Sequence, residues 1–262
     1  MDLGISGRKA LVCASSKGLG RACAQALADE GVKVFINGRD EHRLAQTLQE
    51  FRKAGLQATA IAGDVTTDTG RAALLEACPD ADILINNNAG PSPRYFVEIE
   101  HEDWLAGLEG NMIAPLLLVR ALLPGMRKRR FGRIINITSA MVKLPHPSMA
   151  LSSGARAGLT AIMKGQSVDC ARDNVTINNL LPYIIDTDRQ RWLAQRRAGK
   201  DHVRAGARGS DKRCSGEANG RTARVRSDLR IPVQRARRLH IGTEYPRGRR
   251  FVSRADLIEK LN

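Results

Sequence analysis

The amino-acid sequence predicts one α/β domain built on a doubly wound parallel sheet, followed by a basic tail. Short apolar runs alternate with longer helical stretches from the N-terminus to about Arg189. The runs are apolar throughout, as in strands that helices cover on both faces of a sheet. A chain of 262 residues can bury one full core of this kind. A sheet of this class binds its ligand beyond the carboxyl ends of its strands.

Strands and helices are expected to alternate along the first 190 residues. Six short apolar runs indicate strands: Lys9–Cys13, Val32–Ile36, Ala58–Ala62, Ile83–Ile85, Arg133–Ile137 and Asn174–Leu181. Five longer stretches have apolar residues spaced by three and four, which is typical of amphipathic helices: Leu19–Glu30, Glu41–Ala54, Thr69–Ala77, Trp104–Lys128 and Ser153–Ala171.

The net charge of +15 belongs to the end of the chain. Residues Arg189–Asn262 contain 21 Lys and Arg against 7 Asp and Glu, a balance of +14, so the first 188 residues carry +1. The stretch Arg197–Arg250 is rich in Arg and Gly and has almost no apolar periodicity. We therefore divide the chain into a folded domain, residues 1–190, and an Arg-rich tail, residues 191–262. A disordered tail or a nucleic-acid-binding arm would have the tail's composition.

The composition argues against several classes of protein. No stretch approaches the roughly 20 apolar residues of a membrane span, and the N-terminal residues contain no apolar signal region. None of the cysteines forms a C-x-x-C pair, so neither a disulfide framework nor a metal site is predicted. These features favour a protein of the reducing cytoplasm. The cysteines are Cys13, Cys23, Cys78, Cys170 and Cys214.

A turn with two glycines joins the first predicted strand to the first predicted helix. The turn, Cys13–Gly20, reads CASSKGLG. Its glycines permit close approach of the backbone to a pyrophosphate, and the positive end of the following helix favours the anion. Two glycines also occur in ordinary turns between a strand and a helix, and the match to G-x-G-x-x-G is imperfect. The residues expected to hold a dinucleotide here are Ser15, Ser16, Lys17, Gly18, Leu19 and Gly20.

Two basic residues indicate which dinucleotide the turn would hold. Arg39 follows the second strand, about 20 residues past the turn, where a protein that binds NAD(H) places an acid on the ribose 2′-hydroxyl. A basic residue there suits the 2′-phosphate of NADP(H). Lys17 adds a second positive charge within the turn. The pair favours NADP(H) over NAD(H); the alternative is that both are solvated surface charges.

The first 189 residues resemble the short-chain dehydrogenase/reductase family in several motifs that follow the family's order. The turn resembles T-G-x-x-x-G-x-G with Cys-Ala in place of the first Thr-Gly, and NNNAG resembles N-N-A-G with one additional Asn, which permits two registers. The residues from Pro182 to Thr187 resemble the P-G-x-x-x-T loop that touches nicotinamide, with Tyr183 in place of Gly. The nearest branch is that of the 3-oxoacyl-(acyl-carrier-protein) reductases. The resemblance implies a Rossmann-type fold and cofactor contacts at Asp64, Val65, Asn87, Asn88, Ala89, Gly90, Arg156 and Thr187.

The resemblance also implies a catalytic centre in which two residues are replaced. Asn111 stands where the family keeps an Asn that supports a proton relay, and Ser139 ends the strand that carries the catalytic Ser. Alignment on Ala157–Leu159 places Ser152 and Arg156 at the family's Tyr-x-x-x-Lys pair. Arg156 can donate to ribose hydroxyls but cannot be deprotonated. Ser152 is a poor general acid near neutrality, because its hydroxyl has a far higher pKa than a phenol.

The tail lacks the helix pair that covers the substrate in the family and the last strand, which reads approximately Y-I-T-G-Q-x-I-x-V-D-G-G. Read one base out of register, the codons of Asp228–Arg250 permit a family-like string at all 23 positions, and Arg224–Arg226 permit Glu-Phe-Gly. We therefore interpret the tail as the product of a frameshift that begins between about Arg191 and Arg221. A missing last strand leaves the sixth strand as an unpaired edge, and it removes part of the interface that makes family members homo-oligomers.

Three functions stay open on the sequence alone. The first is an NADP(H)-dependent oxidoreductase that acts on a small-molecule carbonyl or secondary alcohol, with Tyr183, Lys143 or His146 as alternative proton donors or ordinary loop residues. The second is a cofactor-binding protein without turnover, which Ser152 and Arg156 favour. The third is nucleic-acid binding through the tail, which has no recognisable nucleic-acid fold and would bind polyanions nonspecifically.

Overall fold

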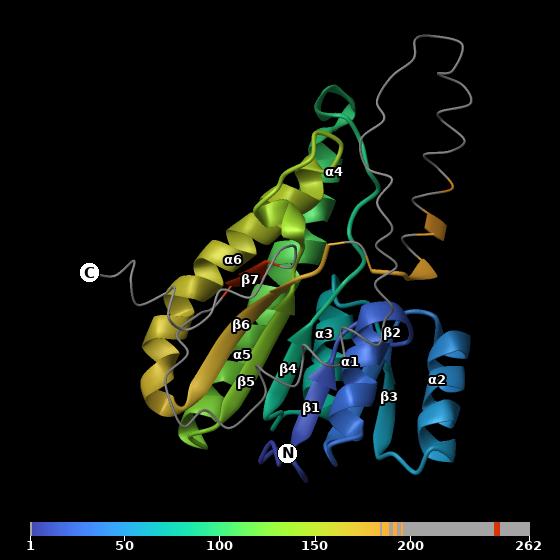
Figure 1. Ribbon diagram of the computed structural model, residues 1–262, viewed down its shortest axis with the longest axis vertical. Helices are drawn as coiled ribbons and strands as arrows, with labels where there is room; N and C mark the ends of the chain where they lie inside the picture. Colours follow the sequence, from blue (N-terminus) through green and yellow to red (C-terminus); the bar gives the residue numbers. More distant parts are fainter. Residues whose placement is uncertain (1, 184, 189–190, 193–194, 196–243, 247–262) are drawn as a thin grey trace.

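A parallel sheet forms the centre of the protein, and helices cover both of its faces (Figure 1). The structure, a computed structural model, describes residues 2–183, 185–188, 191–192, 195 and 244–246. Neighbouring strands pair in parallel in the order β3-β2-β1-β4-β5-β6-β7, which confirms the predicted doubly wound, Rossmann-type domain. The strands are β1 (Lys9–Val12), β2 (Lys33–Gly38), β3 (Ala58–Ala62), β4 (Ile83–Asn86), β5 (Gly132–Ile137), β6 (Val175–Leu181) and β7 (Glu244–Pro246).

The helices follow the strands as predicted, with one difference. The single helix expected over Trp104–Lys128 is two helices joined by a π-helical turn, Glu109–Ile113. Such a turn fits an additional residue into a helix and is common at functional sites. The α-helices are α1 (Gly18–Ala28), α2 (Glu41–Lys53), α3 (Asp68–Ala77), α4 (His101–Leu108), α5 (Ala114–Lys128) and α6 (Ala150–Cys170). Short 3₁₀ turns lie at Phe96–Glu98, Ala140–Val142 and Ala171–Asp173.

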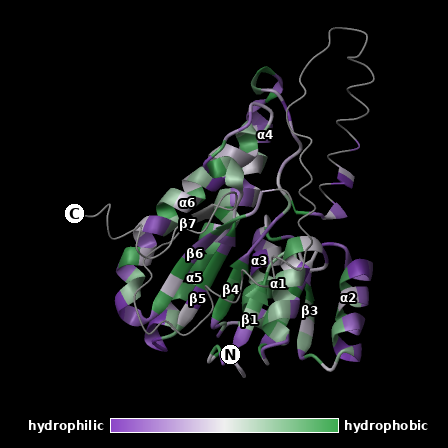
Figure 2. Ribbon diagram, viewed as in Figure 1, coloured by the Kyte–Doolittle hydropathy of each residue, from purple (hydrophilic) through white to green (hydrophobic). Residues whose placement is uncertain are grey.

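The sheet separates two hydrophobic cores. In β1, Ala10 and Val12 pack with side chains of α1 and α2, such as Leu27, whereas Leu11 packs with side chains of α3, α5 and α6, such as Met163. Successive side chains of a strand point to opposite faces, so a strand between two helical layers is apolar at every position. Figure 2 shows mostly hydrophobic strands between helices in which hydrophilic and hydrophobic residues are mixed.

The edge of the sheet differs from the sequence expectation. The three residues of β7 pair in parallel with Asn179–Leu181 of β6, so the prediction of an unpaired sixth strand is wrong over these residues. Pairing at a sheet edge uses backbone groups, and an exposed edge accepts strands of many sequences. The other predictions for residues 196–262, the disordered arm and the shifted frame, fall on positions that the structure leaves undescribed apart from β7.

One helical stretch, His101–Lys128, is long and apolar enough to cross a membrane by length and composition, which differs from the sequence expectation. Within the protein it packs as a core helix, and 44% of its most apolar window is buried. Cys13, Cys23, Cys78 and Cys170 are buried and unpaired with one another. Among the described residues, no group of three His, Cys, Asp or Glu side chains is placed to hold a metal ion.

Candidate functional site

The glycine turn between β1 and α1 has a backbone conformation that few side chains tolerate. Gly18 has a φ of +57°, and Ala14 has a φ of +44°, a region that side chains disfavour. Gly20 admits no side chain, because a Cβ there would lie 2.3 Å from the carbonyl oxygen of Ala14. The side chain of Lys17, the N-cap residue of α1, makes no capping hydrogen bond. The turn and the positive end of α1 can therefore approach an anion directly.

Two buried residues beneath the turn, Ser15 and Asn37, hold it in place. The Asn37 Oδ1 accepts the backbone N–H of Ala14 at 3.1 Å, and its Nδ2 donates to the carbonyl oxygens of Ile61 and Gly63. The Ser15 Oγ accepts the backbone N–H of Asn37 at 2.8 Å. Ser15, predicted as a cofactor contact, therefore supports the turn from inside. Asn37 is not among the predicted site residues, although a polar residue within an apolar strand could have indicated it.

A cavity of about 580 Å³ extends along the carboxyl ends of the strands. Its volume lies in the range of small-molecule and cofactor sites, about 300–1,000 Å³. Ser15, Gly20 and Asn111 lie outside its described wall. The structure brings the other predicted site residues together in that wall: Ser16, Lys17, Gly18, Leu19, Arg39, Asp64, Val65, Asn87, Asn88, Ala89, Gly90, Ser139, Ser152, Arg156 and Thr187.

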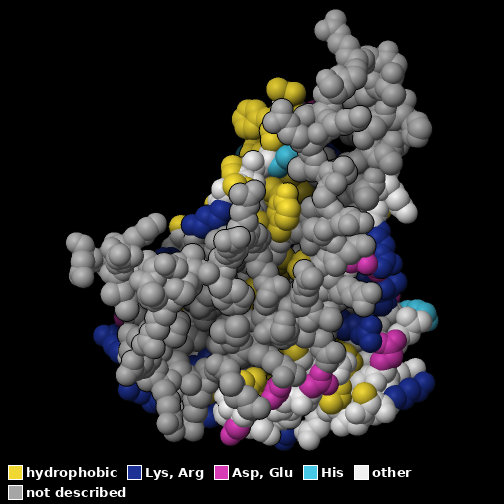
Figure 3. Space-filling model, viewed as in Figure 1, with side chains coloured by type: hydrophobic (Ala, Val, Ile, Leu, Met, Phe, Trp, Pro, Cys, Tyr) yellow, Lys and Arg dark blue, Asp and Glu magenta, His cyan; other side chains and the backbone are white. Residues whose placement is uncertain are grey.

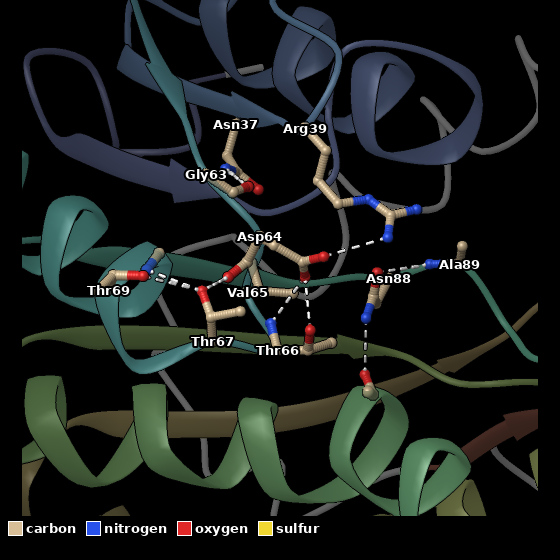
Figure 4. Close-up of polar contacts among 12 residues, drawn as sticks. Asn37, Arg39, Gly63, Asp64, Val65, Thr66, Thr67, Thr69, Asn88 and Ala89 are labelled. Carbon is tan, nitrogen blue, oxygen red and sulfur yellow. Dashed lines mark hydrogen bonds and ion pairs between the residues drawn. The ribbon is translucent and has the colours of Figure 1, made fainter. Parts of the chain in front are cut away.

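Three cations line one end of the cavity, and each faces a carboxylate. The Arg39 Nη1 lies 3.1 Å from the Asp64 Oδ2 (Figure 4). The Arg43 Nη1 and the Lys17 Nζ lie 3.6 and 3.9 Å from the Asp188 Oδ2. Arg43 and Asp188 are not among the predicted site residues. Arg43 lies in the first turn of α2, four residues after Arg39, so this close second basic residue could have indicated it.

Asp64 is held as an anion by its neighbours. The backbone N–H and the Oγ1 hydroxyl of Thr66 donate to its Oδ1 at 2.9 and 2.8 Å, and Arg39 donates to its Oδ2 (Figure 4). Partial burial raises the pKa of Asp64, but these hydrogen bonds and the Arg39 charge outweigh it and hold the pKa below its usual value. The cavity therefore contains a fixed negative charge beside Arg39.

The structure shows which residues of the NNNAG segment reach the cavity. Asn86 is buried in β4 and donates from its Nδ2 to the Asn136 Oδ1 at 2.9 Å. Asn87 donates to the carbonyl oxygen of Ala14 at 3.1 Å, and Asn88 donates to that of Gly110 at 3.0 Å. Of the three asparagines, Asn86 is therefore the one that lies within the sheet. Asn87 and Asn88 line the cavity and connect the end of β4 to the turn and to the π-helical segment.

Arg156 ties together the backbone at the opposite end of the cavity. Its Nε donates to the Ser152 Oγ at 3.2 Å, and its Nη1 donates to the carbonyl oxygens of Thr138, at 3.0 Å, and Ile137. Its Nη2 donates to the carbonyl oxygen of Asn88 at 3.4 Å. Arg156 and Ser152 are both buried. The guanidinium therefore connects α6 with the segments that follow β4 and β5.

Ser139 and Asn111 differ in their access to the cavity. Ser139 lines it, and its Oγ accepts the backbone N–H of Met141 at 3.1 Å. Asn111 is buried in the π-helical turn, where its Nδ2 donates to the carbonyl oxygen of Gly107 at 3.4 Å. Its Oδ1 is buried and accepts no hydrogen bond from the described residues. Ser139 can contact a molecule in the cavity, whereas Asn111 lies behind its wall.

Of the three alternative proton donors, one lines the cavity. Tyr183 stands in its wall and is 45% exposed, whereas Lys143 and His146 belong to the loop after β5 and lie outside the described wall. The end of the molecule that carries α4 exposes hydrophobic side chains (Figure 3), and the large exposed ones of the described chain include Phe96 and Leu144.

Comparison with known proteins identifies the family. The short chain dehydrogenase family model matches residues 8–198. A 3-oxoacyl-(acyl-carrier-protein) reductase of Vibrio cholerae is 32% identical over 216 residues, which cover 80% of this chain and 87% of the relative. An uncharacterized oxidoreductase of Bacillus subtilis is 33% identical over 184 residues, 70% of each chain.

Solved structures give the same result. The L-sorbose reductase of Gluconobacter frateurii, solved with NADPH and L-sorbose, is 27% identical and superposes with a TM-score of 0.80, over 89% of this chain and 92% of that chain. A 3-oxoacyl-(acyl-carrier-protein) reductase of Agrobacterium tumefaciens, solved with NADP, is 26% identical with a TM-score of 0.77, over 89% and 90%. The chain therefore belongs to the short-chain dehydrogenase/reductase family of oxidoreductases.

Proposed function

We propose that this protein is an NADP(H)-dependent oxidoreductase of the 3-oxoacyl reductase type, which reduces a carbonyl or oxidises a secondary alcohol. The observation that carries the proposal is the group of three cations, Lys17, Arg39 and Arg43, at the end of the cavity next to the glycine turn. A 2′-phosphate is the feature that distinguishes NADP(H) from NAD(H), and a cationic site selects for it.

The acid that follows Arg39 supports the same preference. Asp40 caps α2, and its Oδ1 accepts the backbone N–H of Arg43 at 3.0 Å. A capping carboxylate stabilises its helix by about 1 kcal/mol, and the same free energy holds the carboxylate in place. Asp40 also lines the cavity, but its Oδ1 is held by the helix, so we take Arg39 as the side chain that the end of β2 presents to a ribose 2′-position.

The residues of the cavity fit a dinucleotide. The positive φ of Gly18 and the close approach at Gly20 form a cradle that a Cβ would fill. Asp64 and Val65 would hold the adenine, the segment Asn87–Gly90 would line the path to the nicotinamide, and Thr187 would contact the nicotinamide end. A bound nicotinamide supplies or accepts the hydride.

At the end of the cavity that holds Ser139 and Arg156, side chains can position a substrate, but few of them can donate a proton. The Ser139 hydroxyl can donate to a substrate carbonyl oxygen, while Arg156 fixes the positions of Thr138 and Asn88. Ser152 accepts a hydrogen bond from Arg156, so its own hydroxyl proton is directed elsewhere. Tyr183 is the phenol in the described wall of the cavity and would supply the proton.

A second candidate function is cofactor binding without turnover. The bond between Arg156 and Ser152 favours it, because it places a permanently charged group and a weak acid where family members keep a Lys and a Tyr. In this case the protein would bind NADPH and leave ketones unchanged. The experiment below separates the two functions.

Fluorescence titration with NADPH and NADH tests the proposal. We expect saturable NADPH binding, weaker NADH binding, and loss of both in Gly20→Ala, whose Cβ would lie 2.3 Å from a backbone oxygen. Gly165→Ala is the matched control, since a Cβ there meets nothing within 4 Å. Oxidation of NADPH by a panel of ketones then supports turnover, and its absence with intact binding supports the second function. Failure of NADPH to bind overturns both.

We also propose that the tail arises from a reading frame that shifts somewhere between about Arg191 and Arg221. The position of β7 supports this, because the shifted codons of Glu244–Pro246 permit Asn-Ile-Leu, which falls within the family's last strand. The native-frame protein would then be a cytoplasmic homo-oligomer that binds no nucleic acid specifically. Sequencing the gene tests the idea: it fails if no one- or two-base change between the codons of Arg191 and Arg221 restores the strand.

A further inference from the structure

The strongest unexplained feature of the cavity is the position of Asp188. It lies beyond the end of β6 in the chain, and with Thr187 it lines the cavity. The methyl carbon of Thr187 lies 3.8 Å from the point where a Cβ on Gly18 would stand, so Thr187 rests against the turn. From there the Asp188 carboxylate reaches both Arg43, at 3.6 Å, and Lys17, at 3.9 Å.

These two ion pairs are open to exchange with a ligand. The side chains of Arg43, Lys17 and Asp188 are 44%, 58% and 59% exposed. Ion pairs with such exposure are worth about 0–1 kcal/mol, because solvent and salt screen them. A phosphate group carries about −1.5 to −2 charges and three acceptor oxygens, so it outcompetes a single carboxylate for the same two cations.

We infer that Asp188 is an internal competitor for the cofactor's 2′-phosphate: it holds Lys17 and Arg43 in the ligand-free protein and is displaced when NADP(H) binds. This inference rests on the proposed function and adds Arg43 and Asp188 as specificity-determining residues. NADP(H) releases the Asp188 carboxylate from Lys17 and Arg43, because its phosphate takes over both cations. NAD(H) has a hydroxyl at that position and leaves the carboxylate in place.

Substitution of Asp188 tests the inference. The probes are adenosine 2′,5′-bisphosphate, which carries the 2′-phosphate, and adenosine 5′-monophosphate, which lacks it. Isothermal titration of the full chain should show that Asp188→Asn binds the bisphosphate about three- to fivefold more tightly, the factor that loss of one exposed ion pair allows. The affinity for the monophosphate should stay the same, and the gain should shrink at high salt.

Glu41→Gln is the matched control. Glu41 lies at the start of α2, two residues before Arg43, and it is exposed and outside the described cavity wall. The variant removes the same unit of negative charge near the same cations without touching the Asp188 pairs. A gain equal to that of Asp188→Asn would assign the effect to overall charge and would overturn the inference.

Arg43→Gln completes the test. It should weaken bisphosphate binding about tenfold, as expected for loss of a charge-assisted contact to phosphate, and leave the monophosphate unaffected. In the Arg43→Gln background, Asp188→Asn should give a smaller gain, because one of the two cations in competition is gone. Equal gains in both backgrounds would contradict the competition.

The outcomes separate this inference from the proposed function. If the unaltered chain binds neither NADPH nor the bisphosphate, the proposed function fails and the inference with it. If both bind and Asp188→Asn brings no gain, or weakens monophosphate and bisphosphate binding alike, the inference fails and the proposed function stands. Unchanged thermal melting of each variant shows that the differences come from the site.

Discussion

Arg156 donates its Nε–H to the Oγ of Ser152 at 3.2 Å, so the two residues that the sequence resemblance aligns with the family's Lys and Tyr are bonded to each other. They lie four residues apart on α6, where side chains of a helix stand one above the other. The same guanidinium donates to the backbone carbonyl oxygens of Thr138 and Ile137. The pair therefore joins α6 to the end of β5.

Restoration of the family pair should restore proton transfer. We expect the double variant Ser152→Tyr/Arg156→Lys to reduce a ketone about 10- to 100-fold faster than the unaltered chain, because general acid catalysis contributes at least that factor. Ser152 lines the cavity, which leaves room for a phenol. The control is Ser152→Phe/Arg156→Lys, which has the same ring without the hydroxyl. Equal rates of NADPH oxidation in the two double variants would contradict the prediction.

Removal of the Arg156 side chain should destabilise the fold. Arg156→Ala leaves the carbonyl oxygens of Thr138 and Ile137 without their donor, and hydrogen bonds from charged groups are worth about 1.5–3 kcal/mol. We expect the free energy of unfolding in urea to fall by about that amount. Arg172→Ala is the control, since Arg172 is 72% exposed and its ion pairs should cost under about 1 kcal/mol. Similar losses in both variants would show that Arg156 has no special structural role.

Replacement of Ala14 by glycine should stabilise the protein. Its φ of +44° is unfavourable for a residue with a Cβ. We expect Ala14→Gly to raise the free energy of unfolding by about 0.5–1 kcal/mol, the net of relieved strain and greater freedom of the unfolded chain. Ala106→Gly, at an exposed position within α4, should instead lower it by about 1 kcal/mol. A loss of stability in Ala14→Gly would rule out strain at the turn.

Buried thiols should make the protein lose stability in alkali. Burial raises the pKa of the Cys13 and Cys23 thiols to about 12, against 9.0 for an exposed thiol. Above pH 9 the unfolded chain ionises these groups while the folded chain keeps them neutral, so the unfolded state binds fewer protons. Stability is therefore intact below about pH 9 and declines toward pH 12, by about 1.4 kcal/mol per pH unit for each thiol.

Chemical denaturation between pH 8 and pH 11 tests this prediction. In Cys23→Ala the decline above pH 9 should be shallower by the contribution of one thiol. Leu27→Ala, which removes a buried apolar side chain from the same helix, should lower stability equally at every pH and leave the slope unchanged. The same slope in all three proteins would show that the thiols do not contribute.

Part of the site could be predicted from the sequence because its residues are neighbours in the chain. The turn Cys13–Gly20 joins an apolar run to a helical pattern, and Arg39 follows the next run, so both must lie at the carboxyl edge of a parallel sheet. The structure places Lys17, Gly18 and Arg39 in one cavity wall, as this topology requires. Ser15 was assigned to the cofactor for the same reason, although it is turned inward to Asn37.

The sequence by itself determined the fold class, the order of the strands along the chain and the basic character of the nucleotide end, because periodicity and charge are properties of neighbouring residues. Only the tertiary structure decided that Arg43 and Asp188 meet across the cavity and that the edge of β6 is paired. It also decided that Arg156 binds Ser152 and the backbone at the end of β5. These contacts join segments far apart in the chain, and they depend on how the helices pack on the sheet, which local sequence patterns do not encode.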